Sequence, residues 1–316
     1  MRKTPRSEYF GKQRIHWSSV TGLQQVISSL QNRDDTKFIF VNPRVATTGD
    51  GTSIDKAYKT FTEAVARIRA LSTAALKKGY TIFLMSGFSI EKAGIVIDFD
   101  DLWVIGTGLP DDAVLFGSGA TGSVSAATDH LLKISGGSFF ISGVTMYTHK
   151  DTKAAVYLGA ADADGYTGSF GTIQNCFISP QGGGNGQGYG FYLEGACMVT
   201  IDQCDIRGCK SAAVLVTDST VRGGNRNIIR NNFIVGCKYG LSITGIAHNT
   251  TFEGNTVIDG SDADEVLTKC LVASAGFSSG GLFIVNNYLE AADKAGSITN
   301  GGTPTAVHIG NQYSEA

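Results

Sequence analysis

The sequence predicts an all-β solenoid, a coil of short strands in which each turn of the chain stacks on the next. Two observations support this. Beyond residue 130, apolar strand-like segments recur about every 20 to 35 residues, with no helical periodicity between them. The 316 residues also include 41 Gly but only 5 Pro, and only 17% of them are charged. Repeated tight turns need glycine, which adopts a positive φ readily.

The first 37 residues are polar and basic. Their basic residues include Arg2, Lys3, Arg6, Lys12 and Arg14. No apolar segment follows these charges, so the sequence predicts no secretory signal peptide. We interpret residues 1–37 as an attachment arm, 38–100 as an α/β cap that leads into the solenoid, and 101–316 as the solenoid itself.

The cap region begins with a strand expected at 38–41. Thr60 and Glu63 have the spacing of a capping box, in which each side chain satisfies a free backbone N–H at a helix start. Apolar residues then recur at helical spacing, which predicts a helix over about 60–75. Further short strands are expected at 80–85, 95–97 and 102–105.

Two apolar series interleave beyond residue 130. In the first, two apolar residues flank one outward residue, at 132–134, 156–158, 191–193, 214–216, 241–243, 271–273 and 307–309. The second series consists of Ile141, Ile173, Ile201, Ile229, Phe252 and Ile284. Each member is followed five positions later by Met146, Ile178, Ile206, Ile234, Val257 or Leu289. We expect both series to point into the coil.

A third position also repeats, three residues after each member of the second series. It holds Val144, Cys176, Cys204, Asn232, Asn255 and Asn287. Stacked Asn amides can bond to one another along the axis, and Asn tolerates the left-handed backbone of tight turns. The sequence therefore predicts a buried ladder of small and amide side chains at one corner of the coil.

Three segments of the cap resemble the opening of phage tailspike and pectate-lyase-like β-helices. They are Gly49-Asp-Gly-Thr-Ser53, Tyr58-Lys-Thr-Phe-Thr-Glu-Ala-Val65 and Tyr80-Thr-Ile-Phe-Leu-Met-Ser-Gly87. In that family, a Gly-Asp-Gly-Thr stretch precedes a helix that plugs the N-terminal end of the β-helix. The resemblance covers about residues 38–316 and implies a right-handed, single-stranded parallel β-helix of about seven rungs. This fold serves lyases, hydrolases and non-catalytic virion parts alike.

Candidate catalytic residues are carboxylates near the rungs, namely Glu194, Asp202, Asp205 and Glu253. A glycosidase needs two such groups facing one cleft, and the resemblance implies a calcium cluster of acids for lyase activity. However, Asp202, Arg230 and Glu253 fall in one outward column, and alternating sign is typical of a charge-compensated surface ladder. Cysteine and histidine spacing indicates no metal site, and no cofactor motif is present.

Outward aromatic residues are the candidate interface. They are Tyr157, Phe177, Tyr192, Phe233 and Tyr288. On neighbouring rungs they would form an exposed apolar patch, and such a patch usually marks a protein interface. Stacking on sugar rings and coverage by local loops remain alternative roles for these side chains.

The predicted function is that of a non-catalytic phage virion component. We expect a homotrimer assembled in the host cytoplasm with its six cysteines reduced, attached to capsid or tail proteins as a decoration, fibre or spike. Host surface polysaccharide is a further expected partner. A net charge of −2 and the lack of a long apolar run favour neither nucleic acid nor membrane as a partner. The alternative is a polysaccharide-degrading tailspike enzyme, a lyase or glycosidase on the same fold.

Overall fold

The computed structural model describes residues 37–91, 94–107, 112–117, 130–149, 152–159, 167–180, 187–218, 223–245, 247–260, 267–273, 281–291, 298–300 and 307–315. The chain divides into two units, Met1–Phe38 and Ile39–Ala316. The expected attachment arm, including Arg2, Lys3, Arg6, Lys12 and Arg14, lies outside the described residues apart from Lys37.

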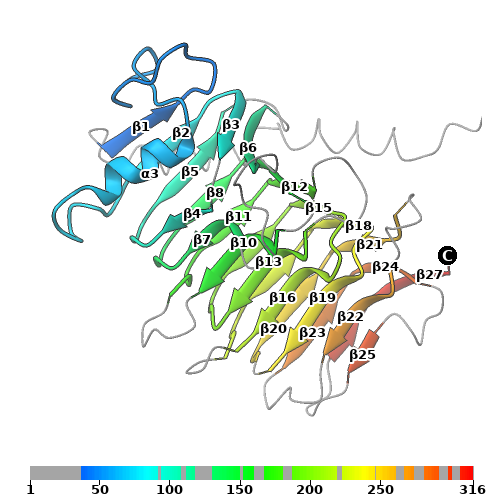
Figure 1. The fold of residues 1–316 in the computed structure, drawn as a ribbon. Helices are drawn as coiled ribbons and strands as arrows, with labels where there is room; N and C mark the ends of the chain where they lie inside the picture. Colours follow the sequence, from blue (N-terminus) through cyan, green and yellow to red (C-terminus); the bar gives the residue numbers. More distant parts are fainter. Residues whose placement is uncertain are drawn as a thin grey trace, which may run out of the picture. The chain divides into compact units, whose positions relative to one another are not determined.

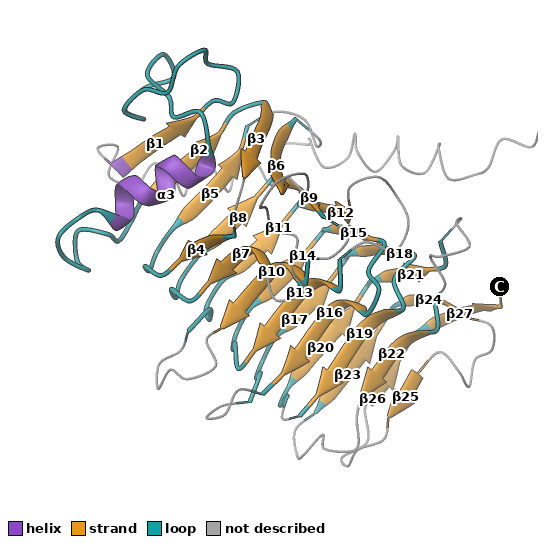
Figure 2. Ribbon diagram, in the orientation of Figure 1, coloured by secondary structure: helices purple, strands orange, loops and turns teal. Residues whose placement is uncertain are grey.

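The second unit is built from three parallel sheets (Figures 1 and 2). Sheet A contains β1 (Phe38–Val41), β2 (Thr81–Leu84), β5 (Trp103–Gly106), β8 (Phe140–Ser142), β11 (Thr172–Gln174), β14 (Thr200–Asp202), β17 (Ile228–Arg230), β20 (Thr250–Glu253), β23 (Leu282–Val285) and β26 (Val307–Ile309). Sheet B contains β3 (Gly87–Glu91), β6 (Ala113–Gly117), β9 (Thr145–Thr148), β12 (Phe177–Pro180), β15 (Asp205–Arg207), β18 (Phe233–Val235), β21 (Thr256–Ile258), β24 (Tyr288–Ala291) and β27 (Gln312–Glu315). Sheet C contains β4 (Ile95–Ile97), β7 (His130–Ile134), β10 (Ala154–Gly159), β13 (Tyr189–Glu194), β16 (Ala212–Thr217), β19 (Tyr239–Thr244), β22 (Lys269–Ala273) and β25 (Ile298–Asn300).

The chain visits sheets A, B and C in turn, and each strand pairs in parallel with the strand one rung away (Figure 1). This is a right-handed parallel β-helix, as the sequence predicts. The rungs begin within the region interpreted as the cap, because β2, β3 and β4 already join the three sheets.

The interior of the coil follows the predicted register. Ile173, Ile201 and Ile229 are aligned across sheet A and fully buried. Their partners on sheet B, Ile178, Ile206 and Ile234, are aligned and buried in the same way. Stacking identical apolar side chains rung on rung lets each rung pack closely on the next, which explains the regular repeat.

The predicted ladder lies at the corner between sheets A and B. The amide nitrogen Nδ2 of Asn232 donates to Oδ1 of Asn255 over 2.9 Å. Asn255 donates in the same way to Asn287 over 3.0 Å, and Asn287 to Asn311 over 2.9 Å. The Oδ1 atom of each amide also accepts a hydrogen bond from the backbone N–H of the ladder residue one rung earlier. The described cysteines are buried free thiols. The ladder is therefore confirmed in the structure.

Helix α3 (Phe61–Arg69) packs its apolar side chains against the first rungs. Thr60 and Glu63 form the predicted capping box. Buried Glu91 accepts hydrogen bonds from the backbone N–H of Phe61 and from the hydroxyl of Thr62, so a carboxylate stabilises the positive end of the helix. The helix ends at Arg69 rather than near residue 75, because the chain leaves the i→i−4 pattern after Ala70: the N–H of Leu71 donates to the carbonyl of Ile68, three residues back.

The last repeat is placed differently from the prediction. Residues 307–309 were expected to continue the first series, but β26 pairs with β23 in sheet A, and His308 is opposite Ile284. Sheet C ends instead with β25, in register with β22. Val307 and Ile309 are exposed. A three-residue apolar–polar–apolar segment fits either face of a strand, so its own pattern cannot set the register.

Candidate functional site

The four candidate carboxylates lie on three different sheets: Asp202 and Glu253 on sheet A, Asp205 on sheet B and Glu194 on sheet C. Asp202 and Glu253 share the predicted outward column but are separated by the rung that carries Arg230. No two of the four therefore lie side by side on neighbouring rungs of one sheet.

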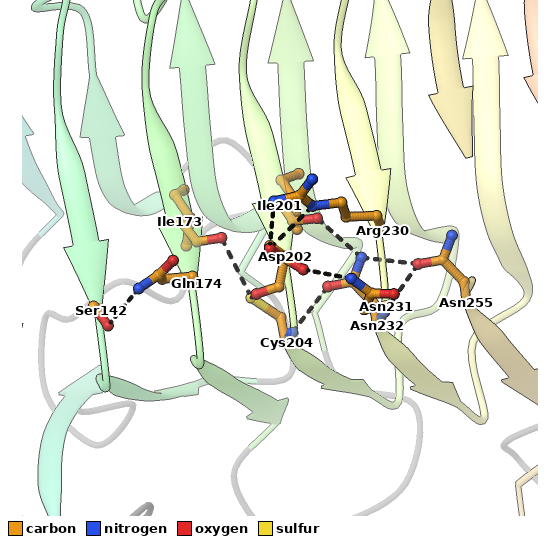
Figure 3. A network of polar contacts seen from close by, with 10 residues as sticks. All are labelled: Ser142, Ile173, Gln174, Ile201, Asp202, Cys204, Arg230, Asn231, Asn232 and Asn255. Carbon is orange, nitrogen blue, oxygen red and sulfur yellow. Dashed lines mark hydrogen bonds and ion pairs between the residues drawn. The ribbon is translucent and has the colours of Figure 1, made fainter. Parts of the chain in front are cut away.

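Asp202 belongs to a structural network on sheet A (Figure 3). Its Oδ2 atom accepts from Arg230 Nε over 3.0 Å and lies 2.9 Å from Nη2. Its Oδ1 atom accepts from the Asn231 amide over 3.0 Å, and the side chain is nearly buried. Further along the column, Gln174 donates to Ser142. The predicted charge-compensated ladder is thus present between Asp202 and Arg230.

Asp205 also has a structural partner. Arg207 holds it through two parallel hydrogen bonds of 2.8 and 2.7 Å. The same guanidinium lies 5.0 Å from the centroid of the Phe177 ring. The carboxylate thus binds one edge of the planar guanidinium, which lies over the Phe177 ring.

The predicted aromatic patch is divided between two faces of the solenoid. Phe177, Phe233 and Tyr288 lie in one row of sheet B, whereas Tyr157 and Tyr192 lie on sheet C. Phe177 and Phe233 are separated by Asp205. Tyr157 is buried, with only 5% of its surface accessible. The expectation of a single flank formed by all five residues is therefore wrong, because each sheet of a solenoid faces its own direction.

Sheet C instead carries a compact aromatic cluster on its outer face. Its rings are those of His130, Tyr157, Tyr192 and Tyr189. The His130 and Tyr157 ring centroids are 4.6 Å apart, those of Tyr157 and Tyr192 are 5.3 Å apart, and those of Tyr192 and Tyr189 are 5.4 Å apart. The hydroxyl of Tyr157 donates to the carboxylate of Glu194. We call these five residues the sheet C cluster.

Two lysines flank the rings. Lys133 Nζ lies 5.2 Å from the centroid of the Tyr157 ring, and Lys153 Nζ lies 4.7 Å from that of Tyr192. Both arrangements are cation–π contacts. Burial, with the positive charges of Lys153 and Lys133, lowers the pKa of His130 to about 4. Burial, with the charge of Glu194, raises the pKa of Tyr192 to about 12.

At neutral pH His130 therefore has a neutral imidazole and Tyr192 a protonated phenol, and the side chains of Glu194, Lys133 and Lys153 lie beside these rings. Nδ1 of His130 is buried and has no hydrogen-bond partner within the described part of the chain. Aromatic faces beside hydrogen-bonding groups can stack on a sugar ring and bind its hydroxyls. Glu194 is the only one of the four candidate carboxylates on sheet C, and its carboxylate is bonded to the Tyr157 hydroxyl.

Sequence reasoning found Tyr157, Tyr192 and Glu194 but missed His130, Tyr189 and the two lysines. A signal for one of them was present, because Lys133 occupies the same outward position of the first series as Tyr157 and Tyr192. His130 and Tyr189 each stand two residues before an inward residue of that series, where strand alternation predicts an inward side chain, so the repeat does not indicate their place on the outer face. Lys153 precedes β10, and nothing in the repeat indicates its contact with Tyr192.

The described residues contain no cluster of three or more His, Cys, Asp or Glu side chains placed to bind a metal ion. The helical residues among them also include no segment with the length and apolar character needed to cross a membrane.

Comparison with known proteins agrees with the architecture. The family described as right handed beta helix region matches residues 162–314. No curated protein matches the chain in sequence at a significant level. Among solved structures, pectate lyase Pel9A is similar with a TM-score of 0.53 and 13% identity, over 91% of this chain and 79% of the lyase.

Two further solved structures are similar. The ORF18 protein of Geobacillus virus E2 has a TM-score of 0.58 and 14% identity, over 85% of this chain and 50% of that protein. The catalytic domain of a GH87 α-1,3-glucanase in complex with nigerose has a TM-score of 0.53 and 14% identity, over 89% of this chain and 46% of that chain. This chain thus spans about half of each of these two. It has the pectate-lyase-like right-handed β-helix fold, a fold shared by proteins of different activities.

Proposed function

We propose that the chain is a non-catalytic structural component of a phage virion that contacts host surface polysaccharide through the sheet C cluster. The observation that carries the non-catalytic part is the dispersal of the candidate acids over three sheets. Asp202, Asp205 and Glu194 are each hydrogen-bonded to a neighbouring side chain. The shared fold with a protein of Geobacillus virus E2 supports the virion part.

The glycan part of the proposal rests on the chemistry of sheet C. Tyr192 and Tyr189 are half-buried and stacked on each other, and Lys153 and Glu194 lie beside Tyr192 as a donor and an acceptor. Rigid aromatic surfaces with a few polar groups are typical of sites that bind sugars weakly but in many copies.

A homotrimer remains part of the proposal, with sheet B as its contact face. The row that holds Phe177, Phe233 and Tyr288 begins at Phe88, which is 58% exposed, and passes through the buried Val114 and Thr145. Ile90, further along the strand of Phe88, is also exposed. Packing three such faces around an axis would bury this apolar surface in a closed assembly. This arrangement leaves the sheet C cluster available to a ligand.

The alternative function is a polysaccharide-degrading enzyme. One arrangement favours it: the Tyr157 hydroxyl donates to Glu194 beside the neutral imidazole of His130. A phenol, a carboxylate and a neutral imidazole in contact are groups able to move protons. The structural similarity to pectate lyase Pel9A and to the glucanase domain is compatible with this function.

A direct test incubates the purified full-length chain with a panel of bacterial capsular and O-antigen polysaccharides. Reducing ends report hydrolysis, ultraviolet absorbance of unsaturated sugars reports lyase activity, and glycan-array fluorescence reports binding. We expect binding without either product, and loss of binding in Tyr192→Ala. Product formation that disappears in Glu194→Gln would establish the enzymatic alternative instead.

The virion and assembly parts need separate measurements. Light scattering at micromolar concentration should give a trimer, and Phe88→Ser with Ile90→Ser should give a monomer if sheet B forms the contact. Mass spectrometry of purified particles should detect the chain. Deletion of residues 1–37 should leave the trimer intact but prevent attachment to particles. A monomeric wild-type protein would contradict the homotrimer. A truncated chain that still attaches to particles would contradict the role of residues 1–37 in attachment.

A further inference from the structure

Two lysines on neighbouring rungs act on one ring of the sheet C cluster. Lys133 lies on β7, and Lys153 directly precedes β10, the next strand of sheet C. Their Nζ atoms lie over the rings of Tyr157 and Tyr192, whose centroids are 4.6 and 6.3 Å from that of His130. Burial and then the positive charges of Lys153 and Lys133 lower the pKa of His130, so both charges are felt at the imidazole. We call Lys133 and Lys153 the lysine pair.

The lysine pair lacks the counter-ions that other charged side chains have. Elsewhere in the described residues, basic groups lie 2.7 to 3.3 Å from carboxylates, in the pairs Arg69–Asp98, Lys78–Asp100, Arg207–Asp205 and Arg230–Asp202. Within the same part of the chain, neither Lys133 nor Lys153 forms such an ion pair. The carboxylate of Glu194 accepts from the Tyr157 hydroxyl and belongs to β13, two strands from His130. Two like charges without a counter-ion produce a positive potential that attracts an anion.

His130 places a hydrogen-bonding group beside these two charges. Its imidazole is neutral at pH 7, so it can donate one N–H without adding a third positive charge. Its buried Nδ1 atom has no partner among the described residues. A buried polar atom left unsatisfied needs an explanation, and one explanation is a bound ion or ligand group. The half-buried rings of Tyr189 and Tyr192, stacked with centroids 5.4 Å apart, supply an aromatic surface next to this polar group.

We infer that the lysine pair binds the anionic group of an acidic polysaccharide, a carboxylate or a phosphate, while the sugar that carries it stacks on Tyr192 and Tyr189. The inference rests on the proposed function and names the class of glycan that the sheet C cluster binds. Hydrogen bonds between charged groups are roughly twice as strong as those between neutral groups, so the anion adds affinity and also selectivity against neutral glycans. The lysines contact the anion directly, without a bridging metal ion.

The test uses the full-length chain and oligosaccharides that differ only in charge. An array of neutral, uronic-acid-containing and phosphorylated bacterial oligosaccharides identifies those that bind. Each bound acidic oligosaccharide is then titrated by calorimetry against its neutral form, which carboxyl reduction or phosphatase treatment provides. The buffer contains EDTA, so that calcium cannot bridge the anion to the protein.

The variants are Lys133→Gln, Lys153→Gln and the matched control Lys238→Gln. Lys238 Nζ lies 5.4 Å from the centroid of the Tyr239 ring and precedes β19, three strands from β10. It therefore makes the same kind of contact on the same sheet, away from His130. All three lysines are at least partly exposed, so each variant should melt close to the wild-type temperature.

We expect the wild-type chain to bind the acidic form at least about tenfold more tightly than its neutral form. Lys133→Gln and Lys153→Gln should each remove most of this preference, and Lys238→Gln should keep it. The acidic ligand should also shift the NMR signals of the His130 imidazole, which the His130→Gln variant assigns. The form that is preferred, uronic acid or phosphorylated sugar, identifies the anion as a carboxylate or a phosphate.

Equal binding of the acidic and neutral forms would overturn the inference, and so would an unshifted His130 signal. An equal loss of preference in Lys238→Gln would also overturn it, since the attraction would then come from the general charge of the sheet. Binding of neutral forms that is lost in Tyr192→Ala would overturn the inference while leaving the glycan contact of the proposed function in place. A wild-type chain that binds no oligosaccharide of either kind would contradict both.

Discussion

The corner between sheets A and B and the outer face of sheet C are formed by the same rungs, yet they follow opposite rules. At the corner, one position repeats as a buried amide on successive rungs, and each amide satisfies its neighbours (Figure 3). On sheet C, successive outward positions hold Lys133, Tyr157, Tyr192, Leu215 and Ser242. The same side chain must repeat where each rung bonds to the next. Outward positions make no such contact, so their side chains can differ from rung to rung and form a site at one place.

This comparison leads to four predictions, and the largest effect is expected in the stacked core. Ile229 is fully buried between Ile201 and Phe252 in sheet A. Ile229→Asp would place an unpaired charge in this apolar column, so we expect no soluble folded protein. Circular dichroism and expression yield measure this. A soluble variant with the wild-type melting temperature would show that the register along the core is not what holds the rungs together.

The second prediction concerns the ladder itself. Asn255→Ala removes the acceptor for the N–H and the amide of Asn232, and it leaves the Ile229 carbonyl and Oδ1 of Asn287 without this donor. We expect a loss of about 3 to 5 kcal/mol in the free energy of unfolding, because several buried groups lose partners at once. Chemical denaturation measures it.

Asn311→Ala serves as the matched control at the end of the ladder. Asn311 is only half-buried, so water can replace part of what is lost, and about 1 to 2 kcal/mol is expected. Equal losses in the two variants would contradict the view that burial gives the ladder its strength.

A smaller stability effect is expected on sheet C. Tyr192 is half-buried, so Tyr192→Ala should lower the free energy of unfolding by about 1 to 2 kcal/mol. Under the proposed function, Tyr192→Ala also loses glycan binding, so we expect a large effect on binding together with a small effect on the free energy of unfolding. A loss of stability as large as that of Asn255→Ala would mean that the sheet C cluster is a structural element like the ladder.

The smallest effect is the contribution of His130 to the pH dependence of the free energy of unfolding. Its pKa is about 4 in the folded chain, below the value of about 6.5 expected when unfolded. The unfolded chain therefore binds a proton first as the pH falls, and stability declines between about pH 6.5 and 4, with no contribution from His130 above that window. We expect about 1 to 2 kcal/mol, measured by denaturation at several pH values. His130→Gln should remove this part of the slope, and an unchanged slope would contradict the burial of the imidazole beside Tyr157 and the two lysines.

The sequence predicted most of the coil because the rungs repeat. The second apolar series, the ladder that includes Asn232 and Asn255, and the capping box of Thr60 with Glu63 were all visible as fixed offsets along the chain. Where the repeat weakens, the prediction failed: residues 307–309 were placed on the wrong sheet, because three residues of alternating character carry no register of their own.

By itself, the sequence determined the fold class, the interior of the rungs and the presence of outward aromatic residues, since these follow from a period of two within strands and a fixed repeat between them. Only the tertiary structure decided which outward residues meet. It separated Phe177 from Tyr157, placed His130 beside Tyr157 and divided the four acids among three sheets. The physical reason is that turn lengths and the direction of each sheet set contacts across rungs, and neither is encoded in the alternation of apolar and polar residues.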